Sequence, residues 1–301
     1  MKVFVSGGGG FLGKHLVSYL KKQGCVVIAP NSKECDLLKP TSLNDYTTES
    51  FDAIFHLAAW TQAGDFCLRH PGDQWVMNQQ INTSMLSWWA TKQPQAKLIT
   101  IGTSCCYEPG SPHSEDHYLQ GQPIESLFTY GMTKRMLLIG QRALEKQYGL
   151  KHLTLVPSTL YGSSYHLDGR QMHFIFDLMR KIVDYKRSGT PVVLWGDGYQ
   201  TRELIHVRDF IETAWKLVNL VENEVINVGS GEAITIRECA SQLAHLVGVP
   251  EDIIQYDEDR YVGAKNKVLK IEKLKRLLPD FSITPLNVGL AEIVEWYQGA
   301  H

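Results

Sequence analysis

The stretch Lys2–Gly13, KVFVSGGGGFLG, decides the fold. Its first residues, Lys2–Ser6, form an apolar run of the kind found in strands buried on both faces of a parallel sheet. Glycines at positions 7, 10 and 13 follow at once, and Leu12, Leu16 and Leu20 then recur at helical spacing. Such glycines allow a tight turn and a close approach of the backbone to a pyrophosphate, which the helix N-terminus would face. The stretch therefore predicts a dinucleotide-binding unit at the start of a parallel α/β sheet.

The composition of the whole chain excludes several classes of protein. The 301 residues suffice for one large α/β domain or two smaller ones. A net charge of -2 argues against a nucleic-acid partner. The opening strand is broken too early for a secretory signal, and no apolar run approaches the ~18 residues of a membrane span. The six cysteines lack a C-x-x-C pair or zinc-ligand spacing, so we expect reduced thiols, no metal site and a cytoplasmic location.

The end of the second expected strand, residues 25–29, bears on the choice of cofactor. An acidic side chain there would bind the ribose 2′-hydroxyl of NAD and repel the 2′-phosphate of NADP. This chain instead has Pro30, Asn31, Ser32 and Lys33. Polar donors and one cation favour NADP over NAD, although Lys33 could also be an ordinary surface lysine.

Two further apolar runs, residues 51–59 and 97–101, are expected to be strands. The first ends in the small residues Ala58 and Ala59, which would let a cofactor approach the backbone. The second leads into Thr103, Ser104 and Cys105. Because ligands of open parallel sheets bind at the carboxyl ends of the strands, these polar side chains lie where chemistry is expected.

Tyr130 and Lys134 are four residues apart, which places them on one face of a helix. A nearby ammonium, and the positive charge of an oxidised nicotinamide, would lower the pKa of the phenol from its usual value of about 10. The tyrosine could then exchange a proton with a substrate oxygen while hydride moves at the same carbon, and Thr103 could hydrogen-bond that oxygen. Tyr-x-x-x-Lys is common by chance, but its position after the glycine motif and the two strands favours catalysis.

Taken in order, these motifs resemble those of the extended short-chain dehydrogenase/reductases, the NAD-dependent epimerase/dehydratase family. The G-x-x-G-x-x-G spacing is the form these enzymes use, and residues 51–59 resemble their fourth-strand motif. The resemblance implies a Rossmann-type, doubly wound parallel sheet (residues 1–160 and about 203–227) and a smaller C-terminal α/β substrate-binding domain (about 161–202 and 228–301). The cofactor contacts that it implies are Gly7, Gly10, Phe11, Leu12, Gly13, Asn31, Ser32, Lys33, Asp36, Leu37, Leu57, Ala58, Ala59, Tyr130, Lys134, Pro157 and Leu160.

Two segments narrow the resemblance to the GDP-L-fucose synthase family. They are residues 103–109 (TSCCYEP) and 115–121 (EDHYLQG). In that family a cysteine and a histidine act as acid and base at the sugar carbons that flank a ketone. Cys105 and His173 hold the corresponding positions, whereas a 4,6-dehydratase would carry an acidic pair after Thr103. The substrate contacts implied by the resemblance are Thr103, Ser104, Cys105, His173, Trp195, Arg202 and Lys267.

The resemblance implies an NADPH-dependent epimerase/reductase acting on a nucleoside-diphosphate 4-keto-6-deoxy sugar, with GDP as the favoured nucleotide. Cys105 and His173 would exchange protons at C3 and C5, and Tyr130 would protonate the oxygen as C4 is reduced. A 4-epimerase with tightly bound NAD, and a 4-keto reductase without epimerisation, remain open, as does a heptose substrate. A non-enzymatic redox sensor is disfavoured because Thr103, Tyr130 and Lys134 are all present. The resemblance also implies a homodimer through helices near residues 74–91 and 130–148.

Overall fold

A six-stranded parallel sheet forms the centre of the fold in the computed structural model, which describes residues 1–259 and 266–300. Its strands run in the order β10-β5-β4-β3-β1-β2, and each neighbouring pair is parallel. The α/β fold class predicted from the sequence is therefore confirmed. The strands are β1 (Lys2–Ser6), β2 (Val26–Ile28), β3 (Ala53–His56), β4 (Lys97–Ile101), β5 (His152–Pro157) and β10 (Glu224–Val228).

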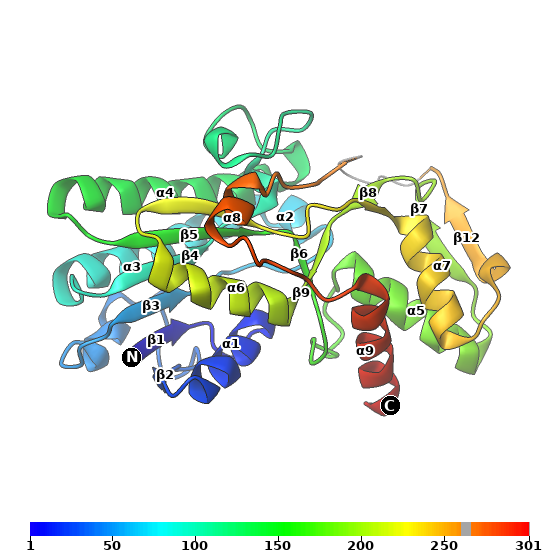
Figure 1. Cartoon of the computed structure of the whole chain (residues 1–301), viewed down its shortest axis with the longest axis horizontal. Coiled ribbons are helices and arrows are strands. Elements are labelled where there is room, and N and C mark those ends of the chain that lie inside the picture. Colours follow the sequence, from blue (N-terminus) through cyan, green and yellow to red (C-terminus); the bar gives the residue numbers. More distant parts are fainter. Residues whose placement is uncertain (260–265, 301) are drawn as a thin grey trace.

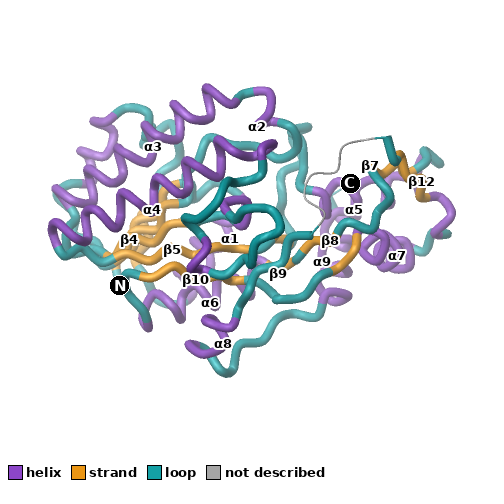
Figure 2. The backbone as a smooth tube through the Cα atoms, turned by 90° about the horizontal axis from the view of Figure 1, so that it is seen from above, coloured by secondary structure: helices purple, strands orange, loops and turns teal. Residues whose placement is uncertain are grey.

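Helices cover both faces of this sheet, as Figure 1 shows. Helices α1 (Phe11–Lys22) and α6 (Val207–Leu220) pack together on one face. Helices α3 (Pro71–Lys92) and α4 (Phe128–Tyr148) pack together on the other, and Figure 2 shows α4 alongside β4 and β5. Because both faces are covered, β1 is buried on both sides, which explains why it is a continuous apolar run and not an alternating one.

The segment that resembles a fourth-strand motif is the third strand of the described chain. Between β2 and β3 the chain forms the 3-10 helix η1 (Pro40–Tyr46) and, among these residues, no additional strand. An extra parallel strand would need two crossovers of about a dozen residues each, and residues 29–52 then leave no room for the strand itself. Consequently β2 is an edge of the sheet.

The second half of the chain builds a smaller group of helices and short strands at one end of the sheet (Figures 1 and 2). Helices α5 (Phe174–Ser188), α7 (Ile236–Val247) and α9 (Leu286–Gly299) share their own hydrophobic core. Three two-stranded pairs accompany them: β7 (Val192–Trp195) with β12 (Ile254–Asp257), β8 (Thr201–Arg202) with β11 (Ile234–Thr235), and β6 (Thr159–Tyr161) with β9 (Leu204–His206). The remaining helices are α2 (Phe66–Arg69), α8 (Glu272–Leu277), η2 (Ser104–Cys106), η3 (Glu115–His117), η4 (Glu125–Leu127) and η5 (Glu251–Ile253).

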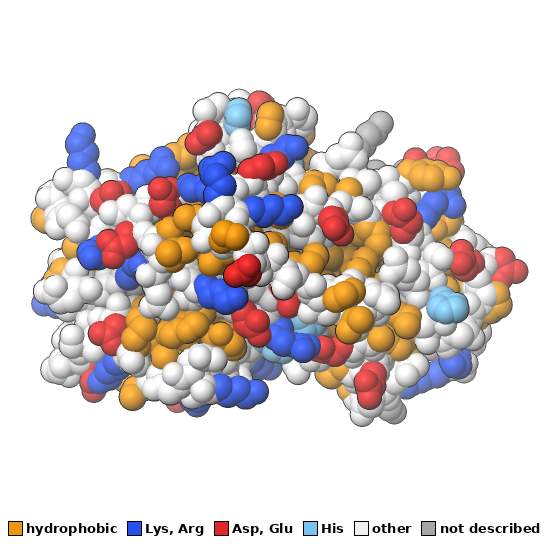
Figure 3. All heavy atoms as spheres, viewed as in Figure 1, with side chains coloured by type: hydrophobic (Ala, Val, Ile, Leu, Met, Phe, Trp, Pro, Cys, Tyr) orange, Lys and Arg blue, Asp and Glu red, His pale blue; other side chains and the backbone are white. Residues whose placement is uncertain are grey.

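The surface carries charges of both signs. On the face seen in Figure 3, basic and acidic side chains are interspersed, and no extended field of one sign is visible there. None of the helices formed by residues 1–259 and 266–300 is long and apolar enough to cross a membrane. The same residues contain no group of three or more His, Cys, Asp or Glu side chains arranged to hold a metal ion.

Candidate active site

The glycine loop between β1 and α1 forms an open cradle of backbone. A Cβ on Gly13 would lie 2.2 Å from the carbonyl oxygen of Gly7, and a Cβ on Gly7, whose φ is +72°, would lie 2.7 Å from the backbone nitrogen of Ala58. Around Gly9, by contrast, a Cβ would meet nothing within 4 Å. The N-cap of α1 is Gly10, which provides no capping side chain. The helix N-terminus therefore keeps its N–H donors for an anion, and the residues fit a pyrophosphate.

The turn after β2 is held by the Asn31 side chain. Its Oδ1 accepts hydrogen bonds from the backbone of Lys33 (2.8 Å) and Glu34 (3.3 Å). The Glu34 carboxylate in turn accepts a hydrogen bond from the backbone nitrogen of Asn31 at 2.9 Å. The acidic side chain is thus turned back onto its own loop, while Ser32 and Lys33 are exposed. Nearby, Asp36 accepts a hydrogen bond from Leu38 at 3.1 Å and Leu37 is buried.

The other expected cofactor residues lie at the carboxyl ends of β3 and β5. Leu57 continues the β3 ladder through a 3.2 Å bond to Ser6, and the backbone nitrogen of Ala58 donates to the Ser6 hydroxyl at 3.3 Å. Ala59 follows in the same loop, and Pro157 and Leu160 lie at the junction of β5 and β6. Phe11 and Leu12, in the first turn of α1, pack against the core. All of these therefore border the end of the sheet where the glycine loop lies.

Thr103 joins the two halves of the reactive group. It is the N-cap of η2, and its hydroxyl accepts a hydrogen bond from the backbone nitrogen of Cys105 at 3.2 Å. The same side chain hydrogen-bonds Tyr130, which lies in the first turn of α4. Ser104 is buried beside it. The end of β4 and the start of α4 are thereby held together.

The electrostatics of Tyr130 differ from the sequence-based expectation. Burial raises the pKa of its phenol, and negative charge on Cys105, Cys106 or Cys67 would raise it further, against the lowering effect of the Thr103 hydrogen bond. Lys134 lies 6.0 Å from the ring centroid of Tyr130, and burial lowers its own pKa to about 8. The expected lowering of the tyrosine pKa by Lys134 is thus outweighed by desolvation. In the protein alone, burial therefore keeps the phenol of Tyr130 protonated at neutral pH.

Cys105 contacts a residue far away in the sequence. The Nζ atom of Lys267 lies 2.9 Å from its sulfur. Burial alone would raise the pKa of the thiol, but the Lys267 charge and hydrogen bond, the Thr103 hydroxyl and the Arg202 charge bring it below its ordinary value. Arg202 is partly buried in β8 and hydrogen-bonds the carbonyl of Thr201 at 2.8 Å. Two cations thus accompany the thiol of Cys105.

His173 is the N-cap residue of α5, and its backbone carbonyl accepts bonds from Phe176 and Asp177. Its side chain is solvent-accessible, yet burial among protein atoms, together with the charges of Lys267 and His166, lowers its pKa to about 4. The Lys267 charge acts on both His173 and Cys105, so these two side chains lie near the same ammonium group. Trp195 is 56% exposed at the end of β7.

Three buried polar residues that the sequence analysis did not assign hold the loops of this site. Arg135 donates to the carbonyls of Gly121 (2.7 Å), Gln120 and Cys106. Asn227 accepts a 2.6 Å bond from the hydroxyl of Tyr107 and donates to the carbonyls of His113 and Lys270. Glu203 accepts from the backbone nitrogens of Gly231 and Leu269, both at 2.7 Å. An arginine or glutamate in an otherwise apolar stretch of sequence indicates a buried side chain that holds loops in place. It does not indicate which backbone groups that side chain binds.

Other polar residues near the site are structural. His56 is buried between the Ser6 hydroxyl (2.8 Å) and Asn82 (3.2 Å). Asn78 binds the backbone of Trp60 and so fixes the loop after β3. The thiol of Cys106 is buried and donates to the Tyr118 hydroxyl at 3.1 Å, so it is a packed cysteine.

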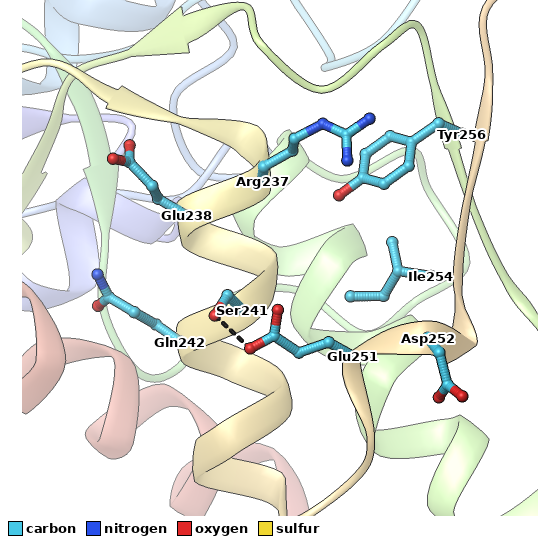
Figure 4. A pocket seen from close by; sticks show the side chains of 8 residues that line it. All are labelled: Arg237, Glu238, Ser241, Gln242, Glu251, Asp252, Ile254 and Tyr256. Atoms are coloured by element: carbon cyan, nitrogen blue, oxygen red, sulfur yellow. Dashed lines mark hydrogen bonds between the residues drawn. The ribbon is translucent and has the colours of Figure 1, made fainter.

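A separate surface hollow of about 660 Å³ lies between α7 and the η5–β12 segment (Figure 4). In it the Ser241 hydroxyl donates to Glu251 at 2.6 Å, and the guanidinium of Arg237 stacks 3.8 Å from the ring of Tyr256. Four of the lining residues are thus paired with one another, and none of the expected site residues is among the lining residues. The hollow is therefore distinct from the candidate site around Thr103, Cys105 and Tyr130.

The fold, together with the site around Thr103, Cys105 and Tyr130, is that of a dinucleotide-dependent enzyme of the short-chain type. The model of the NAD dependent epimerase/dehydratase family matches residues 3–229, and the chain belongs to that family. It is 27% identical to GDP-L-fucose synthase from Escherichia coli, over 98% of this chain and 96% of that protein.

Two solved structures share the fold over almost the full length. A GDP-6-OMe-4-keto-L-xylo-heptose reductase from Campylobacter jejuni superposes with a TM-score of 0.89 at 21% identity, covering 100% of this chain and 98% of that one. A GDP-L-fucose synthetase from Naegleria fowleri bound to NADP gives a TM-score of 0.87 at 22% identity, covering 99% and 92%.

Proposed function

We propose that this protein is an NADPH-dependent epimerase/reductase acting on a GDP-linked 4-keto-6-deoxy sugar. The observation that carries the proposal is the Cys105 thiol, held by Thr103 and Lys267 beside the protonated phenol of Tyr130. A hydride site alone needs the tyrosine and the threonine, whereas a stabilised thiolate adds a proton acceptor. The relatives named as GDP-L-fucose synthases support the substrate class.

The cofactor assignment rests on the turn after β2. Ser32 and Lys33 present exposed polar side chains there, and the carboxylate of Glu34 is bonded to Asn31. This arrangement favours a 2′-phosphate, and the Naegleria relative was solved with NADP. We therefore propose the contacts expected from the sequence, from Gly7 to Leu160, as the NADP-binding residues.

Each side chain has a defined part in the proposed reaction. A ketone at C4 acidifies the protons on C3 and C5, so the Cys105 thiolate can remove one of them to leave an enolate. His173 returns a proton from the opposite face, which inverts the carbon centre. Bound NADPH would supply the hydride that reduces C4. Tyr130 protonates the C4 oxygen as it becomes a hydroxyl, and Arg202 binds the diphosphate.

Incubation with GDP-4-keto-6-deoxymannose and NADPH in deuterated water tests the proposal. We expect solvent deuterium at C3 and C5 of the product and stoichiometric loss of NADPH absorbance. Cys105→Ser should abolish the deuterium exchange and leave simple reduction. Absence of solvent deuterium from the wild-type product would remove the epimerase step. Absence of net NADPH consumption would remove the reductase step, and interconversion of C4 epimers without it would identify a 4-epimerase with bound NAD.

A 4-keto reductase without epimerisation is the second candidate, and one observation favours it. The pKa of His173 is lowered to about 4, so its imidazole is neutral at pH 7 and holds no proton to return. The epimerase requires that bound substrate raise this pKa, which the negative diphosphate can do by offsetting the charge of Lys267. A heptose substrate would be compatible with either candidate.

We also propose a homodimer formed through α3 and α4. Their outer faces expose apolar side chains, among them Val76 (53% exposed) and Ile139 (46%), and Trp75, Phe128 and Met136 extend the same surface. Light scattering should give twice the chain mass for the wild type and one chain mass for Ile139→Glu. The matched change Leu246→Glu on α7 should leave the dimer intact, and a monomeric wild type would refute the proposal.

The division of the chain into a cofactor domain (1–160 and about 203–227) and a substrate domain (about 161–202 and 228–301) is likewise proposed. Separate hydrophobic cores support the division, except that Leu269, Ile271 and Leu274 belong to the core of the central sheet.

A further inference from the structure

The contact between Lys267 and Cys105 joins two parts of the chain that are 162 residues apart. Cys105 lies in η2, directly after β4 of the central sheet. Lys267 lies in the segment that leads into α8, which Figure 1 shows crossing from the smaller group of elements to the sheet. A lysine in such a segment could lie anywhere on the rim, so its placement against the sulfur needs a structural cause.

That cause is a set of buried anchors immediately after Lys267. The backbone nitrogen of Leu269 donates to Glu203 at 2.7 Å. The backbone of Lys270 makes two bonds: its nitrogen donates to the carbonyl of His113, and its oxygen accepts from the side chain of Asn227, both at 3.0 Å. Glu203 and Asn227 are themselves buried. The segment is therefore fixed within three residues of the ammonium.

We propose that Lys267 is a positioning residue that keeps the sulfur of Cys105 in its ionised form, and that Glu203 and Asn227 serve the reaction by anchoring the segment that carries it. The proposal rests on the proposed function for the role of the thiolate as the base at C3 or C5. The ionisation of Cys105 is a property of the protein alone, so it can be measured without any substrate.

Among the cations around Cys105, Lys267 has the largest effect on the ionisation of the thiol. Thr103 supplies hydrogen bonds but no charge. Arg202 adds a second positive charge, with a smaller effect on the thiol than that of Lys267. The other titratable groups that interact with Cys105 are Tyr130, Cys67 and Cys106. Each of them would become negative if it lost its proton, and a negative charge there would oppose the ionisation of Cys105. Removing the charge of Lys267 should therefore leave the thiol under the influence of burial, which opposes ionisation.

The experiment follows alkylation of Cys105 by iodoacetamide as a function of pH, with the Cys105→Ser protein as the blank for the other cysteines. An adjacent opposite charge shifts a pKa by about one to three units. In Lys267→Met the alkylation profile should therefore move to higher pH by at least one unit, with a rate about tenfold lower at pH 7. Lys267→Arg should retain most of the wild-type profile. Lys270→Met is the matched control, because that side chain is exposed and only its backbone takes part in the anchor.

The outcomes separate this inference from the proposed function. An alkylation profile of folded Lys267→Met that coincides with the wild type would overturn the role of Lys267, whatever the activity. A shifted profile in a protein that shows no deuterium exchange at C3 or C5 would uphold the pairing and refute the epimerase step. Thermal unfolding of each variant shows whether it is folded, and thiolate absorbance near 240 nm gives a second measure of ionisation.

Discussion

Gly13→Ala should destabilise the protein and weaken NADPH binding together. The added Cβ would lie 2.2 Å from the Gly7 carbonyl oxygen and 2.7 Å from Gly8 Cα. Comfortable contacts are about 3.5 Å, so backbone that cannot rotate away must move by about 1 Å. Overpacking of this kind costs about 3 kcal/mol at its upper end, and the better helix propensity of alanine offsets about 1 kcal/mol. The net loss is about 2 kcal/mol.

Thermal unfolding and NADPH fluorescence titration measure the two effects. A loss of about 2 kcal/mol corresponds to a fall in Tm of about 3 °C for a chain of 301 residues. A displaced loop should weaken NADPH binding about tenfold or more, or about 1.4 kcal/mol.

Two matched variants isolate the cause. Gly72→Ala, in a helix and with open space around it, should leave Tm within about 1 °C or raise it. Gly9→Ala should spare stability but weaken NADPH binding, since its methyl would enter the open side of the loop. Wild-type stability and affinity in Gly13→Ala would refute the close-approach argument.

Three further predictions concern single side chains. Tyr130→Phe should lower reductase turnover by about 10²–10⁴-fold in steady-state kinetics, because the proton donor is lost; turnover near the wild-type value would exclude Tyr130 as the acid. His56, with its pKa lowered to about 4 by burial and by Lys134, binds a proton in the unfolded chain below about pH 6.5 but not in the folded protein until about pH 4. Stability should therefore fall by about 3 kcal/mol as pH drops through that window, and urea titrations should show a flatter pH dependence in His56→Gln. Arg135→Met leaves three carbonyls without their donor and should lower the free energy of unfolding in urea by about 3 kcal/mol. Arg142→Met, on the exposed face of the same helix, should lower it by less than about 0.5 kcal/mol. Equal losses in the two variants would contradict the buried role of Arg135.

The parts of the fold that local physics determines could be predicted from the sequence. The apolar run of β1 needs no partner to be recognised, because burial on both faces leaves a continuous hydrophobic signature. Gly7 and Gly13 mark close approaches of the backbone that alanine would prevent. Tyr130 and Lys134 share a helix face by periodicity alone, so their proximity follows from the sequence.

Long-range contacts set the rest, and the sequence carries no local trace of them. The pairing of Lys267 with Cys105 depends on where Glu203 and Asn227 anchor a distant segment. The raised pKa of Tyr130 in the protein alone could not be read from the sequence, because the neighbouring ammonium is visible there, whereas desolvation depends on all the atoms packed around the phenol. The strand count near residues 29–52 likewise depends on crossover length, which a strand motif does not reveal.

In the described chain no strand lies between β2 and β3. The turn that bears on cofactor choice is therefore separate from the pairing of the strands, which a longer sheet would combine with it. The turn that carries Asn31, Ser32 and Lys33 leads into the 3-10 helix η1 at the edge of the sheet. The hydrogen-bonded ladder of the sheet ends at β2. Substitutions there would change no strand register and open no gap in the sheet. Cofactor preference is thus a modular property of this scaffold: an engineer could exchange the turn for an acidic one and leave Thr103, Cys105 and Tyr130 where they are.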